Sequence, residues 1–131
     1  MTGPVPPARE LLSAESFGAV VATVLDGDPA LGRERAERMV EEALKFVVVA
    51  AGAPVCRLAP APEVDRGWRA LAAHTPVYTA LCSLLGRYLP HRPLAEPAVD
   101  PEGVRRAVAL ITVAGYVPDR ELWDISPQNR P

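Results

Sequence analysis

The stretch ERAERMVEEALKFVVVAAG (residues 34–52) decides the fold of this chain. Its apolar side chains return every three or four positions, which is the period of a helix with one buried face. Those positions are Ala36, Met39, Val40, Ala43, Leu44 and Val47. From Phe46 onward the stretch is apolar on every side, so we expect this end to be buried. A strand over residues 46–50 is the competing interpretation, because three consecutive valines there are β-branched.

The unbroken helical phase favours a helix, and the residues before it extend that helix to 29–52. Asp28 has a side chain suited to an N-cap, and Pro29 stands at the first helical position, where a missing N–H costs nothing. Charged side chains fill the face opposite the apolar one. We therefore predict that the neighbours Glu41 and Glu42 lie in solvent.

Start and stop signals on both sides predict four more helices and a short turn, at 13–25, 64–73, 76–86, 101–114 and 119–123. Ser13, Thr75 and Asp100 are the expected N-caps, and Gly115 is the expected left-handed residue after the last long helix. The side chains that we expect to be buried are Phe17, Val20, Val21, Val24, Val64, Trp68, Leu71, Ala72, Val77, Leu81, Leu84, Leu85, Val104, Val108, Leu110, Ile111, Leu122 and Trp123.

Proline-rich stretches separate these helices. Residues 53–62 and 88–99 are predicted connectors, because their prolines forbid a regular element. We expect residues 1–10 to be an extended or disordered leader and residues 126–131 to be a frayed tail. No two segments carry hairpin signals. The predicted fold class is therefore all-α, a compact single domain over residues 11–125 with about five helices.

Composition and charge exclude several classes of function. The chain has 131 residues, and 14 Lys and Arg stand against 16 Asp and Glu, for a net charge of −2. A nucleic-acid partner would require a basic excess. The uncharged apolar stretch at residues 46–56 is too short to span a membrane, and no signal-peptide pattern opens the chain. Two cysteines make no disulfide framework, so we expect a cytoplasmic protein with neither nucleic acid nor membrane as a partner.

The segment LAPAPEVDRGWRALAAHTPVYTALCSLLGRYLPHRP (residues 58–93) carries the most distinctive pattern. Its frame is Val64-Asp65-x-x-Trp68, His74-Thr75, Tyr78, Cys82, Gly86, and His91 with Pro93. This frame resembles the glycine-rich-domain-containing-protein-like family of actinobacteria, whose pattern reads VDxxWH, HTxxYxxFC and GxFxHHxP. The likeness touches most of residues 15–123. The resemblance implies metal binding through histidine and cysteine, and it implies no particular reaction.

The chain departs from that pattern at several possible metal ligands. Arg69 and Arg92 replace family histidines, and Leu81 replaces an aromatic residue. The donors that remain for zinc are His74, Cys82, His91 and Asp65. Their spacing contains none of the tight pairs that typify zinc sites. We therefore expect no cofactor and no bound metal, and metal binding stays an alternative.

The two arginines change the chemistry that this segment can perform. The planar guanidinium forks of Arg69 and Arg92 suit carboxylates and phosphates, which predicts a small acidic or polar ligand beside Asp65 and Trp68. An ordinary helix ion pair between Asp65 and Arg69 is the simpler interpretation of that spacing. The candidate acid–base groups of the segment are His74, Tyr78, Cys82 and His91.

Three functions follow from these observations. The first is a ligand-binding or accessory protein with a pocket around residues 58–93. The second is a small cofactor-free enzyme of specialised metabolism that performs a cyclisation, isomerisation or dehydration. The third is a metal-binding protein. An enzyme should gather three or more of the candidate side chains at one cavity, whereas an accessory domain should pack or disperse them. The sequence leaves the oligomeric state open.

Overall fold

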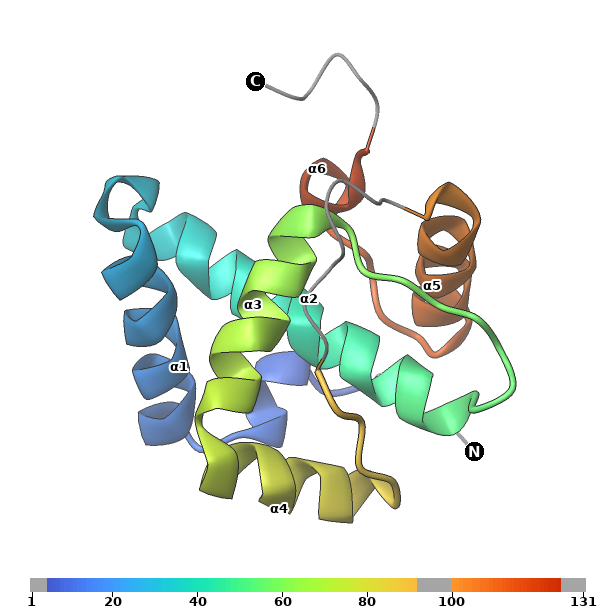
Figure 1. The fold of residues 1–131 in the computed structure, drawn as a ribbon, viewed down its shortest axis with the longest axis horizontal. Helices are drawn as coiled ribbons and strands as arrows, with labels where there is room; N and C mark the ends of the chain where they lie inside the picture. Colours follow the sequence, from blue (N-terminus) through green and yellow to red (C-terminus); the bar gives the residue numbers. More distant parts are fainter. Residues whose placement is uncertain (1–4, 92–99, 126–131) are drawn as a thin grey trace.

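The computed structural model describes residues 5–91 and 100–125, and within these ranges the chain is all-α, as predicted (Figure 1). The helices described there are α1 (Ala14–Gly27), α2 (Arg33–Gly52), α3 (Pro62–Ala73), α4 (Thr75–Leu85), α5 (Pro101–Val113) and α6 (Arg120–Trp123), with the 3₁₀ turns η1 (Ala8–Leu11) and η2 (Pro29–Leu31). Of the predicted connector 88–99, residues 92–99 lie outside the described residues, as do residues 1–4 and the predicted tail.

Helix α2 runs through the middle of the molecule, and each of the other long helices packs against it (Figure 1). Its apolar end is buried as predicted, with Leu44 and Val47 fully inaccessible and Phe46 nearly so. Helices α1 and α3 also pack against each other, whereas α5 packs on a separate part of α2. The helical form of residues 46–50 rules out the competing strand.

A glycine sets how closely α3 approaches α2. A Cβ atom on Gly67 would lie 2.4 Å from the carbonyl oxygen of Met39 and 3.3 Å from the Cβ of Ala43. Only a residue without a side chain fits this crossing. The close approach places α3, which carries Asp65 and Trp68, directly on the central helix.

The predicted caps at the ends of α1 and α5 are confirmed. The Ser13 hydroxyl accepts a hydrogen bond from the backbone N–H of Ser16 at 3.0 Å, and the Asp100 carboxylate accepts one from the N–H of Gly103 at 3.1 Å. Gly115 follows α5 with a φ of 100°, in the left-handed region that glycine tolerates.

The predicted start of the long helix is wrong by four residues. Residues 29–31 form the 3₁₀ turn η2, and α2 begins at Arg33. The cause is Gly32, whose φ of 88° breaks the helical phase. Asp28 makes no side-chain cap bond and instead accepts one from Arg66 at 3.3 Å.

The predicted buried face of α4 is also partly wrong. Leu84 is 69% exposed, while Tyr78, Leu81 and Cys82 are buried. Helix α4 packs mainly on α3 and α2, so it buries one stripe and leaves much of its surface in solvent. Thr75 is its first helical residue rather than its cap. Other predicted core residues that are only partly buried are Trp68, Ala72, Val77, Leu85, Val108 and Leu110.

The prediction that Glu42 lies in solvent is wrong, because this carboxylate is 3% exposed. Its Oε1 accepts hydrogen bonds from the backbone N–H of Asp119 and from the indole N–H of Trp123, both at 3.0 Å. Its Oε2 accepts from the Lys45 ammonium at 2.6 Å. A buried charge is tolerated here because every oxygen has a donor. Glu42 thereby joins α6 to α2.

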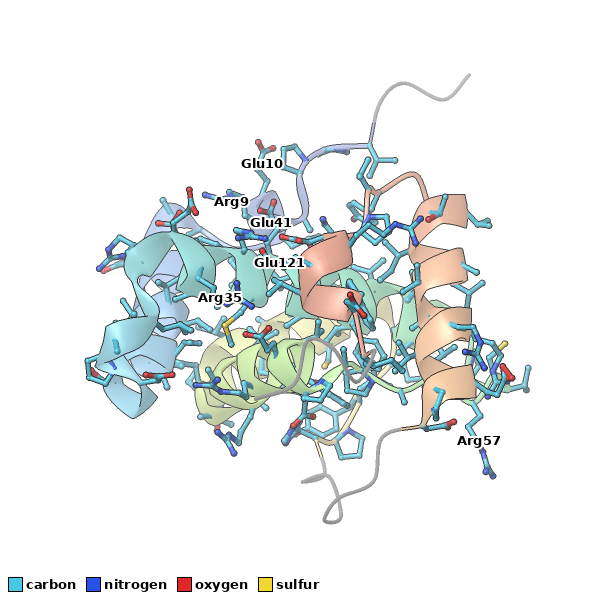
Figure 2. The ribbon with its side chains drawn as sticks, turned by 90° about the horizontal axis from the view of Figure 1, so that it is seen from above. Arg9, Glu10, Arg35, Glu41, Arg57 and Glu121 are labelled. Carbon is cyan, nitrogen blue, oxygen red and sulfur yellow. The ribbon has the colours of Figure 1, made fainter. Side chains whose placement is uncertain are left out.

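Two further groups of ion pairs hold the ends of the described chain on α2. Arg38 binds Asp119 at 2.7 Å and Glu121 at 2.6 Å, which reinforces the attachment of α6. At the other end, η1 includes part of the predicted leader and buries Ala8. Arg9 of η1 bonds Glu41 of α2 at 3.1 Å, and Figure 2 shows these two side chains side by side.

Candidate functional site

Four of the predicted site residues form one network at the junction of α3, α4 and the segment after α4, made of two hydrogen-bonded pairs joined by a ring contact. The His91 Nε2 and the Asp65 Oδ1 are 3.0 Å apart, with the ring nitrogen as donor to the carboxylate. The His91 ring meets the Trp68 ring edge-on, with centroids 4.7 Å apart. The Trp68 indole N–H donates to the Tyr78 hydroxyl at 2.9 Å, and that hydroxyl donates to the carbonyl of Leu89.

This network is closed rather than open to a substrate. Tyr78 is 1% exposed, and the side chains of Asp65 and His91 are 10% and 8% exposed. Within the described residues, no buried side-chain nitrogen or oxygen lacks a hydrogen-bond partner. Burial raises the pKa of Tyr78 well above its ordinary value, so the phenol stays protonated at neutral pH. These contacts fasten the segment after α4 to the α3 helix.

Cys82 lies one turn beyond Tyr78 and is 2% exposed. It borders a hollow of about 370 Å³ whose other lining residues are Thr79, Ser83, Gly86, Arg87 and Tyr88. Among the predicted catalytic residues, Cys82 is the only one in that lining. The buried Tyr78, one turn earlier on α4, is the member of the predicted set that interacts with the Cys82 side chain.

His74 takes part in a different contact, with α1. Its Nε2 lies 2.7 Å from the hydroxyl of Thr23, and the same hydroxyl donates to the carbonyl of Ala19 at 3.2 Å. A threonine hydroxyl has one proton to donate. The hydroxyl donates this proton to Ala19 when Nε2 of His74 carries a hydrogen, and to His74 in the other tautomer. The imidazole thus links the end of α3 to α1.

The prediction of an ion pair between Asp65 and Arg69 is wrong. Asp65 is bound to His91, on the buried side of α3. Arg69 is exposed and lines a hollow of about 210 Å³ between α1 and α3. No carboxylate of the described residues lies within ion-pair distance of it. The carboxylate that the spacing offers to Arg69 is thus taken by a residue far along the chain.

The hollow between α1 and α3 contains a second guanidinium. Arg66 lines it together with Arg69, and Arg66 also reaches Asp28 at 3.3 Å. The remaining lining comes from Thr23, Val24, Gly27, Ala70 and Ala73. Sequence reasoning identified Arg69 but missed Arg66, which the spacing of three along one helix could have indicated. Arg92, the other predicted arginine, lies outside the described residues.

The predicted metal donors are divided among three places, with Cys82 beside the hollow at the end of α4. Asp65 and His91 are paired with each other, and His74 is bonded to Thr23 on α1. In the part of the chain that the structure describes, no three His, Cys, Asp or Glu side chains cluster closely enough to hold a metal ion.

A further hollow, of about 940 Å³, lies between α5 and α6. Sequence reasoning missed it, because α6 is held in this position by contacts with Glu42 and Arg38 of α2, far away in the sequence. The sequence signal for a docked α6 is the apolar pair Leu122 and Trp123, which the structure shows to be buried.

No family model, curated protein or solved structure matches this chain. Membership of the glycine-rich-domain-containing-protein-like family therefore stays a prediction. None of the helices within residues 5–91 and 100–125 is both long and apolar enough to cross a lipid bilayer.

Proposed function

We propose that this chain is a non-catalytic binding protein that holds a small acidic ligand, a carboxylate or a phosphate, between α1 and α3. One observation carries the proposal: Arg66 and Arg69 line the same hollow, and Arg69 has no carboxylate partner among the described residues. A guanidinium presents several donors in a plane and keeps its charge at every physiological pH. Two such groups at one hollow attract an anion.

The size of the hollow limits the ligand. About 210 Å³ is smaller than the cavities that accept drug-sized molecules. The hollow suits an acid of a few carbon atoms or an inorganic oxyanion. The Thr23 hydroxyl adds a polar group to the lining, and Val24, Ala70 and Ala73 supply apolar walls for a short carbon chain.

Two features oppose anion binding and must be outweighed. Asp28 competes for Arg66, although at 3.3 Å and with both side chains more than a third exposed this is a weak pair. The C-terminal end of α1 at Gly27 also lines the hollow, and a helix C-terminus carries partial negative charge. Arg69 therefore supplies the larger part of the attraction in this proposal.

The state of the other candidate residues supports binding over acid–base catalysis. Asp65 and His91 are hydrogen-bonded to each other, and the Tyr78 hydroxyl donates to the Leu89 carbonyl and stays protonated. A general acid or base must reach its substrate within hydrogen-bond distance. Of the predicted catalytic set, none lines the hollow between α1 and α3.

Titration of the full chain with inorganic phosphate and with malonate, followed by two-dimensional amide NMR at low ionic strength, tests this function. We expect saturable shifts confined to residues around Thr23, Arg66 and Arg69, and no such shifts with glycerol as a neutral control. Arg69→Gln should weaken binding tenfold or more, because a hydrogen bond to a charged group contributes about 1.5–3 kcal/mol. Arg33→Gln removes the same charge at the start of α2 and should leave the affinity unchanged.

Two results would contradict the proposal. One is the absence of saturable shifts with either anion at millimolar concentration. The other is an equal loss of affinity in the Arg69 and Arg33 variants, which would mean that the anions respond to net charge alone.

A further inference from the structure

The hollow between α1 and α3 is connected to a histidine that lies outside its lining. Thr23 belongs to that lining. Its hydroxyl lies 2.7 Å from the Nε2 of His74, which stands beside α1 where α3 ends and α4 begins (Figure 1). Histidine is the side chain that ordinarily changes its charge between about pH 5 and pH 8. A titratable ring is therefore one hydrogen bond away from the hollow.

The direction of the Thr23 hydroxyl proton depends on the state of this ring. A hydroxyl has one proton to donate and two lone pairs that accept. When the Nε2 of His74 carries no hydrogen, the hydroxyl donates to it and has no proton left for another group. In the protonated ring both nitrogens are donors, so Nε2 donates to Thr23 and the hydroxyl proton is free. Protonation of His74 therefore turns Thr23 into a donor.

The freed proton is available to a ligand at little cost. Without a ligand, the Ala19 carbonyl accepts it at 3.2 Å. Ala19 and Thr23 both lie within α1, where a carbonyl also accepts the backbone N–H four residues later. The bond from the hydroxyl is a second bond to the same carbonyl, so an anion that takes the proton leaves that carbonyl with its helical partner.

The charged groups on the helices around His74 keep their charge while a histidine titrates. Helix α4 has no charged side chain, and its titratable residues Tyr78 and Cys82 are buried. The charged residues of the other helices are Glu15 and Asp26 on α1, Glu63, Asp65, Arg66 and Arg69 on α3, and Arg33, Glu34, Arg35, Glu37, Arg38, Glu41, Glu42 and Lys45 on α2. Carboxylates, guanidinium groups and lysines ordinarily titrate outside the range from about pH 5.5 to 8.5. The change in charge beside Thr23 within this range therefore comes from the imidazole.

We propose that His74 is a positioning residue that makes anion binding in this hollow depend on pH, an inference that rests on the proposed anion site. The protonated ring adds a positive charge next to the lining and releases the Thr23 hydroxyl to donate to the anion. Both effects favour binding when the ring is charged. By linkage, a bound anion favours the charged ring to the same extent. The ligand is then bound more tightly as the pH falls below neutral and released as it rises.

Sulfate is the probe for this test, because it keeps its two negative charges throughout the range in which histidine titrates. Titration of the full chain with sulfate at low ionic strength, followed by amide NMR, gives the affinity at about pH 5.5 and at about pH 8.5. We expect binding to be about threefold tighter, or more, at the lower pH. His74→Gln offers Thr23 an amide that gains no charge, so the two affinities of this variant should agree within about 1.5-fold.

Two variants of Thr23 separate the hydroxyl from the charge. Thr23→Ser keeps a hydroxyl at this position and should retain the ratio of affinities between the two pH values. Thr23→Val keeps the shape of the side chain but has no proton to release, so its ratio should fall below about twofold. Circular dichroism at both pH values checks that each variant is folded. If His74→Gln does not fold, the two Thr23 variants and the ring titration below decide the question.

The reciprocal effect is visible in the imidazoles themselves. The chain has two histidines, and His91 is bonded to Asp65, which is not in the lining of the hollow. Saturating sulfate should move the titration midpoint of the His74 ring signals to higher pH and leave that of the His91 signals in place. This readout separates a role in anion binding from a purely structural contact between α3 and α1.

Three results would overturn the inference while leaving the anion site standing. One is equal sulfate affinity at the two pH values, and another is the same ratio in the unaltered chain and in His74→Gln. The third is an equal displacement of both histidine midpoints, which would indicate a general effect of ionic strength. An absence of sulfate binding at both pH values would instead overturn the anion site, and this inference with it.

Discussion

At the scale of single residues, one missing side chain decides how the central pair of helices meets. Gly67 lets α3 lie on the backbone of α2, because a Cβ there would come within 2.4 Å of the Met39 carbonyl oxygen. The helical period of residues 62–73 does not show that Gly67 differs from a glycine elsewhere in the helices of this chain. Gly18, by contrast, lies inside α1 with open space around its Cβ position.

These two glycines should respond oppositely to the same substitution. Gly67→Ala should lower the free energy of unfolding by about 2 kcal/mol or more, because the helices must separate to admit the methyl group. Gly18→Ala should raise it by about 0.5–1 kcal/mol, because alanine favours the helix. Urea unfolding of both variants measures the difference. Stabilisation by both changes would show that the close crossing is absent.

The Tyr78 hydroxyl is the second residue-scale feature, since it joins Trp68 to the Leu89 carbonyl. Tyr78→Phe leaves that indole N–H and that carbonyl without partners. The expected cost is about 1–3 kcal/mol. Tyr88→Phe is the control, because Tyr88 is 57% exposed and should change stability by less than about 0.5 kcal/mol. Equal melting temperatures for the two variants would remove the structural role assigned to the Tyr78 hydroxyl.

At the scale of helices, the shortest one depends most on polar contacts. Helix α6 has four residues, too few to be stable alone, and Glu42 and Arg38 of α2 hold it in place. Its apolar residues Leu122 and Trp123 then complete the core. The buried carboxylate of Glu42, on the charged face of α2, therefore links α6 to the central helix.

Removing that link should detach α6. Glu42→Ala should lower the free energy of unfolding by about 3 kcal/mol or more, because the Trp123 indole N–H loses its partner and the Lys45 ammonium loses its counter-charge. Hydrogen exchange of residues 117–123 should accelerate, and Trp123 emission should shift to longer wavelength. Glu41→Ala removes a half-buried surface pair with Arg9 and should cost less than about 1 kcal/mol. Unchanged exchange at 117–123 in the Glu42 variant would refute the link.

At the scale of the whole molecule, ion pairs to α2 make stability depend on pH. Arg38 lowers the pKa of Asp119 and of Glu121 below their ordinary values by hydrogen bonding to both carboxylates. A carboxylate with a depressed pKa in the folded state stabilises the protein above the pKa of the unfolded chain. That contribution disappears as the pH falls through the lower, folded-state value.

The difference in stability between the unaltered chain and Arg38→Gln should therefore be constant at neutral pH. It should shrink as the pH falls below about 4, the region where free carboxylates begin to protonate. Urea midpoints between pH 7 and pH 2 measure this difference. Arg105→Gln, which breaks an exposed pair within one turn of α5, should show a much smaller difference throughout. A difference for Arg38→Gln that persists or grows in acid would contradict the assignment.

Local signals predicted the helices well, and contacts between distant segments decided the candidate site. Ser13, Asp100 and Gly115 act within a few residues of their own position, so their roles could be inferred from the sequence. The partner of Asp65 could not be inferred in this way. Arg69 lies one turn away on the same helix, but the folded chain places His91 against Asp65 instead. Spacing along a helix shows which residues share a face, but it does not show which distant segment will cover that face.

The sequence by itself determined that this chain is all-α and that residues 34–52 form its central helix, because helical period and capping are local properties. Only the tertiary structure decided that Glu42 is buried, that Arg69 faces a hollow beside Arg66, and that α5 and α6 enclose an apolar groove. The physical reason is that burial and charge pairing depend on which distant segments come together. Close packing, as between α3 and α2 at Gly67, decides which segments lie together. Hydrogen bonds between distant residues, as from Trp123 to Glu42, decide it as well.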